Sequence, residues 1–405
     1  MSNSTTNIKE IEKLVVLGLI WGYLPTYILA LGEPFVKDIP GFEAIAILLR
    51  IFIFFFFLYS YAILANAANK YAQYKGYKNY FYIYSILNIF GLSILCLLKN
   101  KNSNNNISEE PLKEFSLLSI LAGYGAISIL LTPLFILTAL WIRGADGLGE
   151  YIQNNEDFLV ISNVVILILY IWYLIREFKR YNLDYKLIFG SLKKIDFKLP
   201  LGLAITDYVF VCGINPPILY GLSFIFPQYV EYLINKEYAS TFIGWLCFAI
   251  SALLFAPVIE ELIFRGLILQ KVAVVQNINK ALLISAFGFA IVHFRFDLVS
   301  LFVGAIVLAI LYLKTKQLAY PILCHFFYNL IAVARNIYTQ YFSNNDPNLK
   351  LTVVEYRQQF IDDWKWCVLF FALSTPYLCY FIYKNYPRNY SIQKLPYYAN
   401  QQNNN

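Results

Sequence analysis

Long apolar runs, separated by short polar stretches, dominate the hydrophobic pattern of the chain. Runs such as Leu14 to Leu31, Ile45 to Ala65 and Phe158 to Ile175 reach or approach the roughly 20 residues that cross a bilayer as a helix. The pattern predicts an all-α fold, a polytopic transmembrane helical bundle with about ten or eleven spans. The expected spans lie near residues 14–32, 42–65, 79–98, 115–141, 158–175, 199–226, 240–270, 280–296, 298–313, 318–335 and 365–383.

Composition excludes a soluble fold. The chain is 59% hydrophobic and only 14% charged, against roughly 25% charged residues in a typical soluble domain. We therefore expect an integral, multi-pass membrane protein, and the sequence does not say which membrane. The six cysteines are scattered through apolar segments without C-x-x-C spacing, so we expect neither a disulfide framework nor a thiolate zinc site.

The net charge of +7 comes from basic residues in loops. Attraction to anionic lipid explains this pattern better than nucleic acid does, so the bilayer is the expected partner and nucleic acid is not. The lysine-rich loops 66–78 and 176–198 should both be cytoplasmic, yet three expected spans separate them. An odd number of spans cannot join two loops on one side, so one segment between 79 and 175 does not cross the membrane.

Both histidines of the chain, His293 and His325, lie inside apolar segments. A lone membrane histidine more often makes a helix–helix hydrogen bond than it catalyses a reaction. The helix expected near 240–270 changes that balance, because it carries Glu260, Glu261 and Arg265 in an apolar run. A charge at the centre of a membrane helix costs about 2.5–3.5 kcal/mol on insertion scales, so these groups need protein partners or a wet cavity.

The two carboxylates, Glu260 and Glu261, differ in their expected partners. Glu261 and Arg265 stand four residues apart with the acid first, the favoured order for an ion pair on one helix face. Glu260 lies about 100° around the helix and needs a partner on another helix or a water molecule.

Asp207, in an earlier span, could line a substrate path or serve as a local cap near Asn215-Pro216-Pro217, which we expect to be unwound.

The polar groups are expected at a similar depth in the membrane. Glu260 lies eleven residues before Lys271, His293 thirteen after Lys280, and His325 eleven after Lys314. At 1.5 Å per residue all three lie about 16–20 Å from the cytoplasmic face. Asn329, four residues after His325, shares its helix face. A carboxylate, an imidazole from another helix and a His and Asn pair are the groups that water-mediated acyl hydrolysis needs.

These residues form three ordered motifs. In chain order they are Glu260-Glu261-Leu262-Ile263-Phe264-Arg265-Gly266, Phe289-x-x-x-His293 and His325-x-x-x-Asn329. They resemble the motifs of the CAAX prenyl endopeptidase and bacteriocin-processing (CPBP or Abi) family, over roughly residues 200–335. The resemblance implies that Glu260 and His293 activate a water, that His325 and Asn329 form the oxyanion site, and that Glu261 and Arg265 support them. Phe302-x-Gly304 also resembles the family's linker between the second and third motifs.

The resemblance divides the chain into three expected regions. Residues 1–195 form N-terminal transmembrane helices of unknown role, 196–340 the CAAX-protease-like intramembrane domain, and 341–405 a loop, the last transmembrane helix and a polar tail. The Asn-rich stretch 100–106 and the tail 397–405 are polar and low in complexity, so we expect both to be flexible.

The sequence leaves alternatives open for both the mechanism and the function. Glu260, His293 and His325 could be a three-ligand zinc site, but no H-E-x-x-H is present and each ligand comes from a different helix, so we expect no cofactor. The expected substrate is a membrane-embedded or lipidated peptide or protein. The competing functions are a catalytically silent membrane scaffold or immunity protein and, less favoured because no inverted repeat is visible, a secondary transporter.

Overall fold

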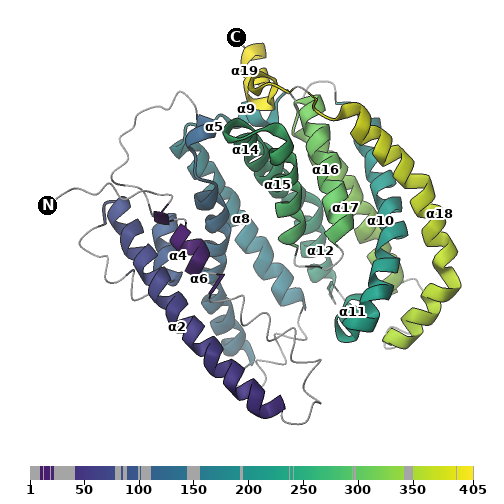
Figure 1. Ribbon diagram of the computed structural model, residues 1–405, viewed down its shortest axis with the longest axis horizontal. Helices are drawn as coiled ribbons and strands as arrows, with labels where there is room; N and C mark the ends of the chain where they lie inside the picture. The colour runs from purple at the N-terminus through teal and green to yellow at the C-terminus, as the bar shows by residue number, and fades with distance from the viewer. Residues whose placement is uncertain are drawn as a thin grey trace. The chain divides into compact units, whose positions relative to one another are not determined.

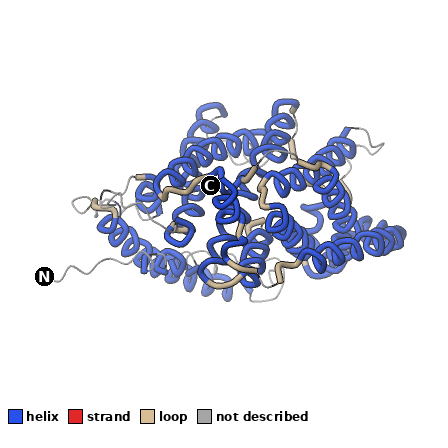
Figure 2. The backbone as a smooth tube through the Cα atoms, turned by 90° about the horizontal axis from the view of Figure 1, so that it is seen from above, coloured by secondary structure: helices blue, strands red, loops and turns tan. Residues whose placement is uncertain are grey.

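The computed structural model describes residues 10–11, 13–18, 20–21, 42–77, 84, 89–98, 101, 111–143, 156–191, 195–236, 238–239, 241–293, 295, 298–341, 350–388 and 390–404. These residues form helices and no strand (Figure 2), which confirms the all-α prediction. The Asn-rich stretch 100–106 lies outside the described residues except for Lys101.

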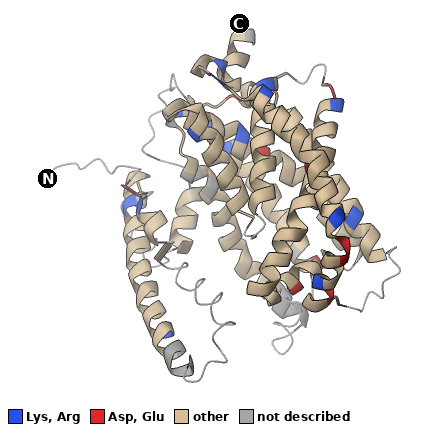
Figure 3. Cartoon of the chain, turned by 45° about the vertical axis from the view of Figure 1, so that its right-hand side comes forward, with Lys and Arg blue, Asp and Glu red and all other residues tan. Residues whose placement is uncertain are grey.

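Six described helices are long and apolar enough to cross a membrane. Charged residues are sparse along them, and Figure 3 shows long stretches of ribbon without Lys, Arg, Asp or Glu. The chain is therefore a multi-pass membrane protein, although the expected count of ten or eleven spans is not confirmed. The six are Ile47–Tyr74, Val160–Arg180, Lys198–Ile225, Phe242–Val275, Leu298–Thr315 and Val353–Asn385, beside the shorter apolar helices Ala122–Thr138 and Ile278–Ile291.

The chain forms two compact units. The first comprises Met1–Ile107, Ser116–Asp146 and Ile168–Glu177, and the second comprises Ser108–Phe115, Gly147–Leu167 and Phe178–Asn405. Helix α8 (Glu156–Arg180) contributes residues to both. Every residue of the three motifs belongs to the second unit.

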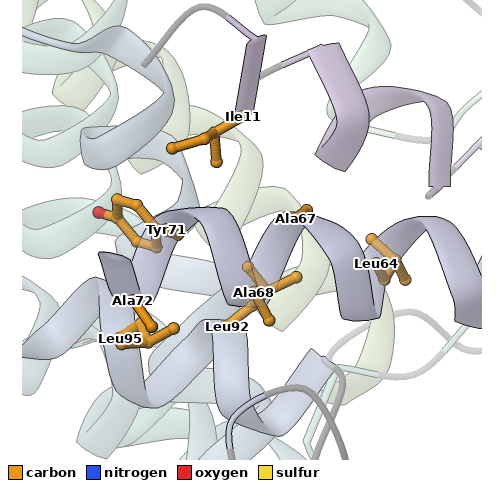
Figure 4. Close-up of a cluster of buried hydrophobic side chains, with 8 residues drawn as sticks. All are labelled: Ile11, Leu64, Ala67, Ala68, Tyr71, Ala72, Leu92 and Leu95. Carbon is orange, nitrogen blue, oxygen red and sulfur yellow. The ribbon is translucent and has the colours of Figure 1, made fainter. Parts of the chain in front are cut away.

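In the first unit, α2 (Phe42–Tyr74) packs against α4 (Ile89–Leu97), and α4 packs against α6 (Leu117–Arg143). The described residues of α4 number nine and cover about 13 Å. Buried Lys75 donates to the carbonyl oxygens of Cys96 and Leu98 at the end of this helix, at 3.2 and 2.6 Å. Figure 4 shows the cluster of buried side chains around α2 and α4: Ile11, Leu64, Ala67, Ala68, Tyr71, Ala72, Leu92 and Leu95.

The second unit is a bundle of longer helices. Helix α10 (Lys198–Ile225) packs against α17 (Ala319–Tyr341) and α18 (Val353–Asn385), while α16 (Leu298–Thr315) packs against α15 (Ile278–Ile291) and α17 (Figure 1). The expected unwinding at Asn215-Pro216-Pro217 is wrong, because α10 remains helical through both prolines. Short helices of this unit include α5 (Pro111–Glu114), α9 (Tyr185–Phe189) and α11 (Pro227–Ile234).

The prediction of a flexible tail is wrong. Residues after α18 form a 3₁₀ turn (Ile392–Lys394) and helix α19 (Pro396–Asn404), which packs against α9. Tyr397 is 4% exposed, and its backbone N–H donates to Oε1 of Gln270 at 2.8 Å. The Asn400 amide donates to the carbonyl oxygens of Leu187 and Lys316. The polar composition of the tail therefore serves hydrogen bonds to the bundle.

Candidate active site

One continuous helical segment, 242–275, carries the first motif and contains two π-helical stretches. It consists of α12 (Phe242–Ile250), a π-helix (Ser251–Phe255), α13 (Ala256–Glu261), a second π-helix (Leu262–Leu269) and α14 (Gln270–Val275). Glu260 and Glu261 stand at the end of α13, directly before the second π-helix. Such i→i+5 turns are rare and occur frequently at functional sites.

Glu261 is fully buried, and its Oε1 atom accepts two hydrogen bonds. Arg265 donates from Nη1 at 2.9 Å, and Nδ1 of His325 lies 3.0 Å away. Arg265 is also fully buried, donates from Nη2 to the carbonyl oxygen of Ala305 at 3.1 Å, and places its guanidinium 4.5 Å from the centre of the Phe289 ring. The structure thus brings together the ion pair expected from sequence and adds His325 to it.

Glu260 faces the other histidine. Its Oε2 atom lies 3.9 Å from Nε2 of His293, and the two side chains are 27% and 26% exposed. Oε2 is itself buried and accepts no hydrogen bond from any described residue. Nδ1 of His293 lies 2.7 Å from the carbonyl oxygen of Phe289, which assigns the proton of a neutral ring to Nδ1 and leaves a lone pair on Nε2.

Phe289 connects the three motifs through its ring. The ring lies 4.7 Å from that of His293 and 6.0 Å from that of His325, and it meets Phe264 of the first motif edge-on at 5.3 Å. The Ser285 hydroxyl donates to the carbonyl oxygen of Phe264 at 2.8 Å and holds α15 against the motif segment. Phe289 belongs to the second motif, but nothing in its spacing predicted that one ring would contact Arg265 and both histidines.

Asn329 holds the backbone of the motif segment. Its Nδ2 donates to the carbonyl oxygen of Ala252 at 2.7 Å, inside the first π-helix. One amide hydrogen is therefore engaged, and the second is the one left for a ligand. Backbone acceptors such as the carbonyls of Ala252 and Ala305 carry no residue-type signature, so sequence reasoning missed both.

The candidate zinc ligands test the metal alternative. A catalytic zinc site needs three ligand atoms about 2 Å from one point. No group of three His, Cys, Asp or Glu side chains in the described part of the chain is arranged to hold a metal ion. Glu260 and His293 face each other, and the Nδ1 atom of His325 bonds Glu261, which leaves its Nε2 atom free. The metal-free mechanism stays a prediction, and no step is derived through a metal.

A comparison with known families agrees with the geometry. Residues 242–331 match the family described as Type II CAAX prenyl endopeptidase Rce1-like. This confirms the resemblance drawn from the three motifs, over a shorter range than the 200–335 expected. The match includes all six candidate site residues, Glu260, Glu261, Arg265, His293, His325 and Asn329. No curated protein and no solved structure matches the chain.

Proposed function

We propose that the chain is an intramembrane endopeptidase that hydrolyses a peptide bond in a membrane-associated or lipidated peptide. The observation that carries the proposal is the facing pair of Glu260 and His293, 3.9 Å apart, beside the Glu261–His325 pair. At the family level, the matched Rce1-like domain supports a CAAX-protease-like hydrolase. The roles of individual residues below belong to the proposal.

Glu260 and His293 hold and activate the water. Their facing atoms, Oε2 and Nε2, are both acceptors when Glu260 is ionised and His293 carries its proton on Nδ1. One water can donate a hydrogen bond to each of them and direct an oxygen lone pair at the substrate carbonyl. Glu260 then takes a proton as the C–O bond forms, a general-base step worth about 10²- to 10⁴-fold in rate.

His325 and Asn329 stabilise the tetrahedral intermediate. Glu261 accepts from Nδ1 of His325, so Nε2 donates to the oxyanion when the ring is an imidazolium, and the Glu261 carboxylate stabilises that form. Loss of one oxyanion donor typically costs about 10²- to 10³-fold in rate. When the intermediate collapses, the C–N bond breaks and Glu260 passes its proton to the departing amine. The products are a carboxylic acid and an amine.

Arg265 is a positioning residue, and Asn329 makes a positioning contact in addition to its oxyanion role. Arg265 compensates the charge of Glu261 and ties it to Ala305 on α16, which fixes the aim of His325. Asn329, through Ala252, holds the first π-helix of the motif segment. Both contacts keep the motif segment, α16 and α17 in one arrangement, as a preorganised site requires.

The test is cleavage of a library of lipidated and membrane-tethered peptides by purified protein, followed by mass spectrometry. Wild type is compared with Glu260→Gln, which keeps the shape of the side chain and removes the base. Glu231→Gln on α11 is the matched control, because Glu231 is exposed and outside the site. We expect Glu260→Gln to lower kcat by at least about 10²-fold and the control to match wild type.

Chelation separates the two mechanisms. Activity that survives a chelator in wild type supports the glutamate mechanism, and loss under chelation with rescue by zinc would overturn it. If wild type cleaves no peptide of the library, the catalytically silent scaffold becomes the favoured function. Equal cleavage by wild type and Glu260→Gln would refute the role of Glu260 while leaving a hydrolase.

A further inference from the structure

Asp207 is a third carboxylate close to the depth of the candidate active site, in addition to Glu260 and Glu261. It lies nine residues after Lys198, where α10 begins, or about 14 Å along that helix. The rings of its neighbour Tyr208 and of Tyr328 on α17 are 5.7 Å apart, which places this turn of α10 beside the His325–Asn329 turn of α17. The Asp207 carboxylate is within electrostatic range of His325.

The helix packing makes room for this carboxylate at a glycine. A Cβ atom added to Gly304 on α16 would lie 2.8 Å from Oδ2 and 3.4 Å from Oδ1 of Asp207. The first of these distances is too short for a carbon beside a carboxylate oxygen, so the approach of Asp207 to α16 depends on the missing side chain. Gly304 stands in the segment Phe302-x-Gly304, within the part of the chain matched by the family.

His325 acts electrostatically on the Asp207 carboxylate, but one of the carboxylate oxygens lacks a hydrogen-bond donor within the described structure. This oxygen, Oδ1, is buried and accepts no hydrogen bond from any described residue. Arg265, the buried cation of the site, donates instead to Glu261 and to the Ala305 carbonyl. Leaving a buried polar atom unsatisfied costs free energy, and more so for a charged group. A ligand that brings a positive charge removes this cost, whereas an apolar ligand of the same size does not.

From this geometry we infer that Asp207 is a specificity-determining residue that binds a Lys or Arg side chain of the peptide substrate, close to the scissile bond. This inference rests on the proposed function. Because α10, α16 and α17 position the carboxylate at the level of His325, the bound cation belongs within a few residues of the hydrolysed bond. The substrate class becomes a membrane-associated peptide with a basic residue beside the cleavage site.

The experiment uses membrane-tethered peptides in which one position at a time on either side of the cleaved bond is Lys or norleucine. Norleucine keeps the length of the lysine stem and removes the charge. For wild type we expect kcat/KM at one position to favour Lys by at least about tenfold, since a site built for a polar group discriminates strongly against its absence. In Asp207→Asn that ratio should fall to about one.

Gly304→Ala perturbs the same carboxylate without removing its charge. Its Cβ displaces Asp207, so the Lys preference should fall at least about threefold, whereas Gly221→Ala on α10 should keep the wild-type preference because a Cβ there has nothing within 4 Å. Thermal unfolding of each variant in detergent identifies any that fail to fold. A wild-type enzyme that cleaves Lys and norleucine peptides equally at every position would overturn the inference, and this result needs no variant.

Binding distinguishes this inference from the proposed function. The affinities of wild type for the Lys and norleucine peptides, measured by fluorescence anisotropy in detergent, do not depend on turnover. Tighter binding of a Lys peptide that Asp207→Asn abolishes supports the role of Asp207 even if no peptide is cleaved. Equal affinities for both peptides in wild type, together with cleavage, would remove the basic-residue specificity and keep the endopeptidase.

Discussion

Replacing Arg265 with Leu tests whether the buried network of Glu261, Arg265 and His325 is a coupled unit. The substitution removes a charge-assisted hydrogen bond to Glu261, worth about 1.5–3 kcal/mol, and leaves the Ala305 carbonyl without its guanidinium donor, at about 1–3 kcal/mol. It also removes the cation–π contact with Phe289, worth about 1 kcal/mol. Because both partners are fully buried, we expect a loss of about 4 kcal/mol in the free energy of unfolding, within the range known for breaking a buried pair.

A double-mutant cycle with Glu261→Gln isolates the coupling. Glutamine keeps an Oε1 acceptor for His325 but carries no charge, so Arg265→Leu leaves no uncompensated carboxylate in that background. We expect the Arg265→Leu cost to be smaller there by at least about 2 kcal/mol.

The assay is unfolding of the purified protein in mixed micelles with increasing sodium dodecyl sulfate, followed by far-ultraviolet circular dichroism. Lys280→Leu, which removes an exposed cation on α15, is the control and should change stability by no more than about 0.5 kcal/mol. Costs of Arg265→Leu and Glu261→Gln that add within about 0.5 kcal/mol would refute the coupled network.

Two further predictions concern packing and pH. Gly213→Ala on α10 should destabilise the protein by about 1–3 kcal/mol, because the added Cβ would lie 2.6 Å from the backbone nitrogen of Phe371 on α18. Gly221→Ala faces open space and should stabilise the protein by about 0.5–1 kcal/mol. Opposite shifts of the unfolding midpoint would support this prediction, and equal shifts would contradict it. Burial, and then the charge of Lys394, lower the pKa of Lys316 to about 8 where it donates to Tyr390 and to the Lys394 carbonyl. The protonated form is therefore disfavoured while the tail is docked, and docking of residues 390–404 should strengthen as pH rises through about 8 toward the ordinary lysine range. Hydrogen exchange of this segment at about pH 7 and about pH 9.5, corrected for the intrinsic exchange rates, measures the effect, and Lys316→Met should abolish the difference.

Sequence predicted the parts of the site that follow from spacing and depth. The lysine-marked helix ends placed Glu260, His293 and His325 at one level, and the structure brings the first two within 3.9 Å. The four-residue spacing predicted the Glu261–Arg265 pair, found at 2.9 Å. Both succeed because helical rise and periodicity fix where a residue lies along and around a straight helix.

Contacts to the backbone and local changes of helix type could not be predicted in this way. Any residue supplies a carbonyl oxygen, so nothing in the sequence pointed to Ala252 or Ala305 as partners of Asn329 and Arg265. The π-helical stretches share the apolar composition of the α-helix around them. The tail 397–405 was expected to be flexible from its Asn and Gln content, but Tyr397 is buried there, as is Leu395 just before it.

Two consecutive carboxylates differ in environment because one helical residue separates them. The turn of about 100° directs Glu261 to Arg265 and His325, where it is fully buried, and directs Glu260 to His293, where it stays 27% exposed. The Oε1 atom of Glu261 is occupied by two hydrogen bonds, whereas the partly exposed Glu260 is the carboxylate that can meet water. The assignment depends on the rotation of the motif segment about its own axis. Asn329 binds the π-helical carbonyl of Ala252, two turns before these residues, and Arg265 binds α16 one turn after them, so the two contacts fix that rotation from both sides.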